Sequence, residues 1–123
     1  MNLVDSCGWL EFFADGPNAE YFAAPIADRA NLIVPTICIL EACKIALQKR
    51  GEKEAQKIVS IMLKGHVVDL DSSIAVNAAI IGLEIGLPLA DSVILATARK
   101  HNAIIWTQDA DFSGIEGVQY IAK

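Results

Sequence analysis

The chain alternates between short runs that are apolar throughout and longer segments in which apolar residues recur at helical spacing. The apolar runs predict strands at 2–5, 32–35, 66–70, 103–107 and 118–121. Strands without polar alternation, separated by helices, are typical of a parallel sheet covered on both faces. The sequence therefore predicts an α/β fold, a three-layer α/β/α sandwich around a five-stranded, mostly parallel sheet.

The helical spacing predicts six helices between these strands. They are expected at 6–13, 18–27, 37–50, 52–63, from Ser72 or Ser73 to about 85, and at 89–101. Thr36 is expected to cap the helix at 37–50, and Ser72 or Ser73 the helix that ends near 85. Gly51 and Gly65 are expected to end the second pair of helices, which would form a helical hairpin.

Length and composition indicate one domain, spanning residues 1–123, with an apolar surplus. The chain has 123 residues, of which 54% are hydrophobic and 20% are charged, more apolar than an average soluble domain. We expect an exposed apolar patch that serves as a homodimer face or as a groove for a partner segment. No run reaches the ~18 apolar residues of a membrane helix, and no basic leader precedes the first strand. A cytoplasmic protein that does not contact a membrane is expected.

Charge and cysteine content limit the classes of function. The net charge of −5 argues against binding nucleic acid through a broad basic surface. The three cysteines have no C-x-x-C spacing and lie among apolar residues, so packed free thiols are expected.

Carboxylates inside apolar stretches are the strongest chemical signal. Asp5 is the only charged residue before Glu11, and Asp91 is the only one between Glu84 and Arg99. Glu41 is similarly isolated between Arg29 and Lys44, and Asp109 follows a predicted strand. Buried carboxylates are normally paired, protonated or bound to a metal. Because ligands bind beyond the carboxyl ends of parallel strands, we expect these four acids to converge on a cation.

Each acid also has a purely structural interpretation. Asp5 is suited to cap the first helix, and Asp91 is favoured in a first helical turn. Glu41 is spaced to pair with Lys44, and Asp109 and Asp111 are common turn formers. The functional prediction therefore depends on the four acids as a set.

An all-oxygen site favours Mg²⁺, with Mn²⁺ as the alternative, and such an ion suits phosphodiester hydrolysis. The ion would also turn an acidic pocket into a phosphate site, which answers the objection from net charge. Six of the ten basic residues lie in the predicted hairpin, where they would guide a nucleic-acid backbone. A solvated helix face balanced by acids is at least as good an interpretation for most of them. Lys44, close to Glu41, is the one that we expect to bind substrate.

Four segments in order resemble PIN domains, and within them the VapC-type toxins of toxin–antitoxin pairs. The segments are 3–6, similar to "LVDSS"; 34–36 leading to Glu41; 89–98, similar to "ADALIAATA"; and 106–112, similar to "VTRDxDF". Cys7 departs from this pattern, since members often carry a second hydroxyl residue there.

The resemblance implies a metal-dependent endoribonuclease. Asp5 and Asp91 would be the most direct Mg²⁺ ligands, with Glu41 and Asp109 completing the acidic pocket. Ser6 or Thr107 would lie next to these ligands without binding the ion and would hold them in position. Asp111 would be a reserve ligand. The resemblance also implies an RNA substrate, a dimer, and an antitoxin whose C-terminal segment covers the pocket.

Three alternatives from other classes are a receiver-type module, a haloacid-dehalogenase-type phosphatase and an inactive PIN scaffold. A receiver-type signalling module would need paired acids after the first strand and a lysine after a later one, and Ser6-Cys7 and 104–107 do not supply them. A phosphatase of the haloacid-dehalogenase type fails on the same first motif. An inactive PIN scaffold would lack one or more of the acids, and all four are present. A solitary RNA-processing nuclease stays open beside the toxin.

Overall fold

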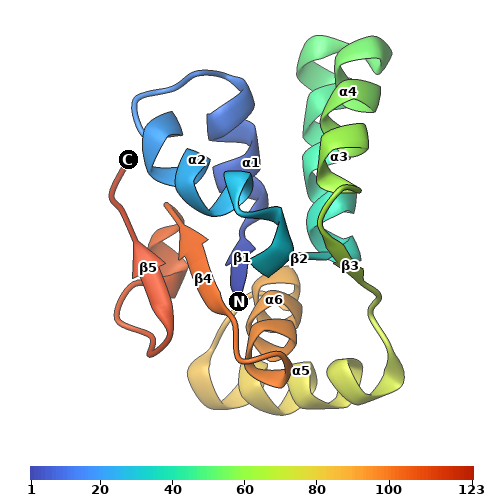
Figure 1. The fold of residues 1–123 in the computed structure, drawn as a ribbon. Helices are drawn as coiled ribbons and strands as arrows, with labels where there is room; N and C mark the ends of the chain where they lie inside the picture. Colours follow the sequence, from blue (N-terminus) through green and yellow to red (C-terminus); the bar gives the residue numbers. More distant parts are fainter.

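Five short parallel strands form the centre of the computed structural model, which describes residues 1–123 (Figure 1). The strands are β1 (Asn2–Val4), β2 (Leu32–Pro35), β3 (His66–Val68), β4 (Ile104–Thr107) and β5 (Val118–Tyr120). The α-helices are α1 (Ser6–Phe13), α2 (Ala19–Ala27), α3 (Thr36–Arg50), α4 (Glu52–Met62), α5 (Ser72–Ile85) and α6 (Leu89–Lys100). Two short 3₁₀ turns, η1 (Arg29–Asn31) and η2 (Ala110–Phe112), complete the chain.

The order of the strands makes the connections change direction between β1 and β4. The sheet runs β3-β2-β1-β4-β5, and every neighbouring pair is parallel. The chain moves from β1 to β2 to β3 in one direction and then returns through α5 and α6 to β4, on the other side of β1. The connections of an open α/β sheet reverse at such a point, and ligands bind beyond the carboxyl ends of the strands there. The predicted fold class is confirmed.

The helices form the outer layers. Right-handed crossovers place α1 to α4 on one face of the sheet and α5 and α6 on the other, because the direction of travel reverses after β3. A core cluster of 19 residues joins the sheet to these helices. A smaller cluster fills the contact between α5 and α6: Ile74, Ala78, Val93 and Ala96. Figure 1 shows the α3–α4 hairpin standing beside α1 and α2, with α5 at the opposite end of the molecule.

A glycine permits the close packing of α1, the helix that begins at the site. A Cβ atom on Gly8 would lie 2.7 Å from the Phe22 ring of α2 and 2.8 Å from Val4 of β1. A larger side chain has no room there, so Gly8 lets α1 approach both the sheet and its neighbouring helix.

Two expected helix caps are wrong. Pro35, not Thr36, is the N-cap of α3, and the Thr36 hydroxyl instead accepts from the backbone N–H of Leu70 at 3.4 Å. Asp71, not Ser72 or Ser73, caps α5 by accepting from the backbone N–H of Ile74.

Burial differs between the edge and the centre of the sheet. β3 is an edge strand and has two exposed residues. The central strand β2, by contrast, is buried along its whole length.

The chain has no single helix that is both long and apolar enough to cross a membrane. The α5–α6 pair meets the length and composition criteria only when taken together, with a bend of 114° at the junction.

Candidate metal centre at the ends of β1 and β4

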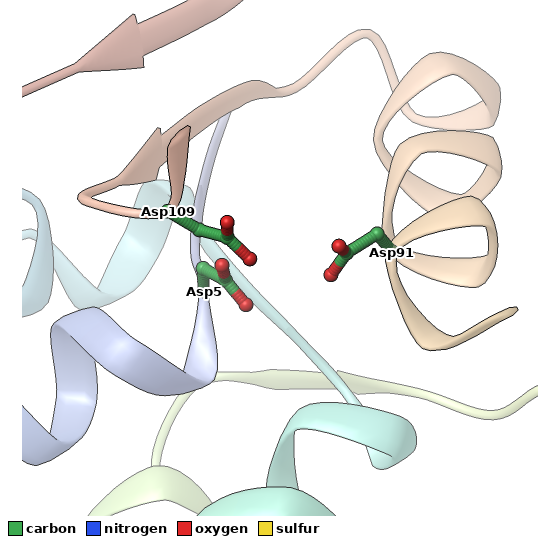
Figure 2. Close-up of side chains that lie close together, drawn as sticks. All are labelled: Asp5, Asp91 and Asp109. Atoms are coloured by element: carbon green, nitrogen blue, oxygen red, sulfur yellow. The ribbon is translucent and has the colours of Figure 1, made fainter. Parts of the chain in front are cut away.

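Three aspartates from separate parts of the chain meet at the edge of the sheet where β1 and β4 end. Val4 of β1 pairs with Trp106 of β4, so the next residues of both strands leave the sheet side by side. Asp5 follows β1 directly, and Asp109 lies two residues beyond the end of β4. Asp91 is in the first turn of α6 and faces the other two across the site (Figure 2).

The three carboxylates are spaced to share one cation. One oxygen from each of Asp5, Asp91 and Asp109 lies within 4.8 Å of the others. Asp5 is 3% exposed and Asp91 is 8% exposed, whereas Asp109 is half-buried. Carboxylates brought this close repel one another unless a proton or a cation lies between them.

Asp5 is held rigidly by its neighbours. Its Oδ1 accepts from the backbone N–H of Ser6 at 2.7 Å, which makes Asp5 the N-cap of α1. Its Oδ2 accepts from the Thr107 hydroxyl at 2.9 Å and from the Cys7 thiol at 3.4 Å. The capping interpretation of Asp5 is therefore correct, and the same side chain also faces the cluster.

Glu41 lies beside the three aspartates and is connected to them through Ser6. The Ser6 hydroxyl donates to Glu41 Oε1 at 3.1 Å and lies 3.4 Å from Asp5 Oδ1. The alternative interpretation of Glu41, an ion pair with Lys44, is wrong: the one ion pair of the chain joins Lys100 to Asp71. Glu41 is half-buried and Lys44 is exposed.

Asp111, the reserve ligand of the sequence prediction, lies outside the group of three. It is exposed, and its backbone N–H donates to Asp109 Oδ1 at 2.9 Å. Asp109 therefore caps η2, as its turn-forming interpretation expects, and also contributes to the cluster. The Asp109 backbone N–H donates to the Thr107 hydroxyl at 2.9 Å, so Thr107 links two of the acids.

The pKa values of three acids of the site are raised by burial and by the negative charges around them. Burial, together with the charges of Asp109 and Asp5, raises the pKa of Asp91 to about 7. Burial also raises the pKa of Asp5, against the opposing effect of its hydrogen bonds. The pKa of Glu41 is raised by burial and by the charge of Asp5. A bound cation would relieve all three of these penalties.

Cys7 is a contributor whose role the sequence did not reveal. Its Sγ lies 3.4 Å from both Asp5 Oδ2 and the Thr107 hydroxyl. Burial and the charge of Asp5 raise the pKa of the Cys7 thiol to about 12, so it stays protonated and donates to Asp5. The motif had marked Cys7 only as a departure, and the contact depends on packing between residues one hundred positions apart.

The family comparison supports the geometry. The family model for the PIN domain matches residues 3–118 of the chain. No curated protein sequence matches this chain.

Solved structures agree with this match over nearly the whole chain. A protein in a toxin–antitoxin complex from Klebsiella pneumoniae is 25% identical, with a TM-score of 0.80 over 97% of this chain and 96% of that one. VapC20 of Mycobacterium tuberculosis, a Sarcin-Ricin loop cleaving toxin, is 16% identical, with a TM-score of 0.78 over 94% and 95% of the two chains. VapBC2 from Rickettsia felis, solved on a promoter DNA fragment, is 12% identical, with a TM-score of 0.74 over 98% and 97%. The chain belongs to the PIN-domain family and has the fold of the VapC toxins.

Proposed function

We propose that the chain is a Mg²⁺-dependent endoribonuclease that hydrolyses phosphodiester bonds of RNA. The observation that carries the proposal is the set of three aspartate oxygens within 4.8 Å of one another, with no lysine or arginine paired to them. The family and the VapC fold support nuclease activity, and VapC20 is a relative in fold that cleaves the Sarcin-Ricin loop.

The donor set suits a hard divalent cation. Asp5, Asp91 and Asp109 would hold it, because Mg²⁺ and Mn²⁺ prefer carboxylate oxygens and water, and the cluster contains no histidine. When bound, the ion supplies acidification of a water molecule and neutralisation of charge on the phosphate oxygens.

Residues of the chain hold the Asp5 carboxylate in position and provide an acceptor for a proton. Thr107, Ser6 and Cys7 fix Asp5, so that its carboxylate does not turn away from the cluster. Glu41 Oε1 is occupied by the Ser6 hydroxyl, which leaves Oε2 without a hydrogen-bond partner. The raised pKa of Glu41 suits it to accept the proton of the attacking water at that oxygen.

The biological role that we propose is that of a toxin inhibited by a cognate antitoxin protein in the cytoplasm. Support comes from solved structures of similar fold, such as the protein in the toxin–antitoxin complex from Klebsiella pneumoniae and VapBC2 from Rickettsia felis. An antitoxin segment over the acidic site would block RNA and exclude the cation together.

RNA cleavage by the purified chain is the test of the proposed activity. Single-stranded RNA should be cut internally in Mg²⁺ or Mn²⁺, and EDTA should stop the reaction because the acids alone repel the phosphate. Gel analysis of end-labelled RNA measures this. Cleavage that persists in EDTA, or a protein that is stable and loaded with metal but leaves RNA intact, would contradict the proposal.

We also propose that α5 and the start of α6 form a homodimer face. Large apolar side chains recur there at helical spacing and are strongly exposed: Val76 60%, Ile80 52%, Leu83 89% and Leu89 87%. Beside them, an apolar cavity of about 590 Å³ lies between α5, α6 and Ile37. A nearly uncharged stripe of this kind is self-complementary, so a second copy of the chain is the occupant that fits.

Leu83→Asp should convert the dimer to a monomer, because it places a charge in the middle of the apolar face. Light scattering after size-exclusion chromatography, at micromolar concentration, measures the mass. Leu47→Asp is the matched control: Leu47 is 48% exposed on α3, and its substitution should leave the dimer intact. A wild-type chain that is monomeric at every concentration would contradict the proposal.

A further inference from the structure

A second pocket shares a wall with the acidic cluster and has the opposite charge. Its cavity of about 320 Å³ lies between α1 and α3. The lining includes three cations, Lys49, Arg50 and Lys123, and one acid, Glu11. It is the basic counterpart of the acidic site.

The α3 cations of this pocket are free of ion pairs. The one ion pair of the chain joins Lys100 to Asp71, so no carboxylate neutralises Lys49 or Arg50. Arg50 Nη1 donates only to the carbonyl of Phe13, at 3.4 Å. Glu11 Oε2 instead accepts from the backbone N–H of Asn18 at 2.8 Å. Two exposed side chains thus offer several N–H donors to an anion in the cavity.

Two wall residues tie the pocket to the metal centre. Cys7 lines the pocket, and its Sγ lies 3.4 Å from Asp5 Oδ2. Gln108 lines it too and stands in sequence between Thr107, which holds Asp5, and Asp109 of the cluster. The Gln108 side-chain oxygen accepts from Asn18 at 2.9 Å, so its amide N–H groups are the ones left to donate. The pocket and the acidic cluster therefore lie on either side of these two residues.

We infer that this pocket binds a second phosphate of the RNA backbone, apart from the phosphate that is cleaved, and that Lys49 and Arg50 hold it. The inference rests on the proposed ribonuclease function and adds a position for the substrate. It also replaces the expected substrate residue: Lys44 is exposed on the same helix, but it lies outside this pocket. A basic pocket beside an acidic site explains how a chain of net charge −5 positions an anionic polymer.

The test compares two double variants in RNA binding. Lys49→Gln with Arg50→Gln removes the two pocket cations, and Lys53→Gln with Lys57→Gln removes two exposed cations of α4 as a matched control. Both carry Asp5→Asn to prevent cleavage. Binding of a single-stranded RNA 12-mer is measured by fluorescence anisotropy over a range of salt concentrations. Each neutralised phosphate contributes about 0.7 to the slope of log K against log salt, so the pocket variant, which loses one phosphate contact, should lose about 0.7.

Cleavage kinetics without Asp5→Asn give a second readout. The pocket variant should raise KM for the 12-mer about tenfold or more with kcat nearly unchanged, because the acids remain in place. A dinucleotide, which has no second phosphate, should be cleaved equally by the wild type and the variant. Thermal melting within a few degrees of the wild type shows that both variants are folded.

The outcomes separate the two proposals. Wild-type cleavage with an unchanged salt slope and KM in the pocket variant would overturn the pocket while leaving the ribonuclease intact. No binding and no cleavage of RNA by the wild type would overturn both. A variant that binds RNA normally but loses affinity for a co-purified antitoxin would assign the pocket to a protein partner, which also overturns the inference.

Discussion

Asp91→Asn should reduce Mg²⁺-dependent RNA cleavage by about 1000-fold, equivalent to about 4 kcal/mol of transition-state stabilisation. Asp91 supplies one of three clustered carboxylates and comes from α6, whereas the other two follow the strands. The substitution keeps the size of the side chain and removes the charge that attracts the cation. Initial rates on labelled RNA at saturating Mg²⁺ measure the loss.

The same substitution should stabilise the metal-free protein, which separates loss of function from loss of fold. Burial and repulsion raise the pKa of Asp91 to about 7, so its charged form is unfavourable in the folded state. A neutral amide removes that penalty, and the melting temperature at pH 8 should rise by a few degrees. Glu116→Gln, at an exposed acid outside the cluster, is the control and should change neither cleavage nor stability. If the chain is a toxin, Asp91→Asn should also relieve growth arrest on its expression.

A slow variant that also melts earlier would indicate a damaged fold. Cleavage by Asp91→Asn at the wild-type rate would show that Asp91 is not needed in the metal centre.

The metal-free protein should lose stability as the pH rises, and Mg²⁺ should restore it. The pKa of Asp91 is about 7 in the folded state against an ordinary value of 3.8. A raised carboxyl pKa contributes stability that is fully present below the ordinary value and is lost between pH 3.8 and about 7. The pKa values of Asp5 and Glu41 are raised in the same direction. The melting temperature in EDTA should therefore be lower at pH 8 than at pH 5.

Added metal reverses the trend because it binds the deprotonated carboxylates. At one fixed concentration, about 100 times the Kd at pH 8, Mg²⁺ adds about 2.7 kcal/mol at that pH, which for a chain of this size raises the melting temperature by roughly 10 °C. The increase should be larger at pH 8 than at pH 5. Scanning fluorimetry at the two pH values, with and without Mg²⁺, measures both effects. A metal-free protein that is more stable at pH 8, or an equal Mg²⁺ effect at both, would contradict the assigned protonation states.

The parts of the site that could be predicted from the sequence are those with a local signal. Asp5 and Asp91 stand alone in apolar stretches, and the cost of burying a charge without a partner marks such residues. The parallel sheet follows from apolar runs separated by helices, because strands that are joined through helical crossovers lie parallel. The structure brings these two acids together with Asp109 as expected.

The parts that could not be predicted depend on packing between distant segments. The contact of Cys7 with Asp5 and Thr107 requires α1 and the end of β4 to meet, and no spacing in the sequence encodes that distance. The pocket between α1 and α3 was similarly hidden. Lys44 and Lys49 both lie on α3, and only the approach of α1 shows that Lys49 lines this pocket and Lys44 does not.

Local choices between equivalent residues also went wrong. Asp71, Ser72 and Ser73 are all good helix caps, and it is the Asp71 carboxylate that accepts from the backbone N–H of Ile74. Glu41 likewise had more than one possible partner. Its spacing from Lys44 permits an ion pair, yet its carboxylate turns to the Ser6 hydroxyl of a different helix.

Calorimetric titration of Mn²⁺ into the wild type and into Asp91→Asn tests the central claim most directly. Three carboxylates that share one cation predict binding by the wild type that releases protons at pH 7, since Asp91 is partly protonated there. Asp91→Asn should bind at least about tenfold more weakly and release fewer protons. Equal affinity and equal proton release in the two proteins would show that the metal, if it binds, does so away from Asp5, Asp91 and Asp109.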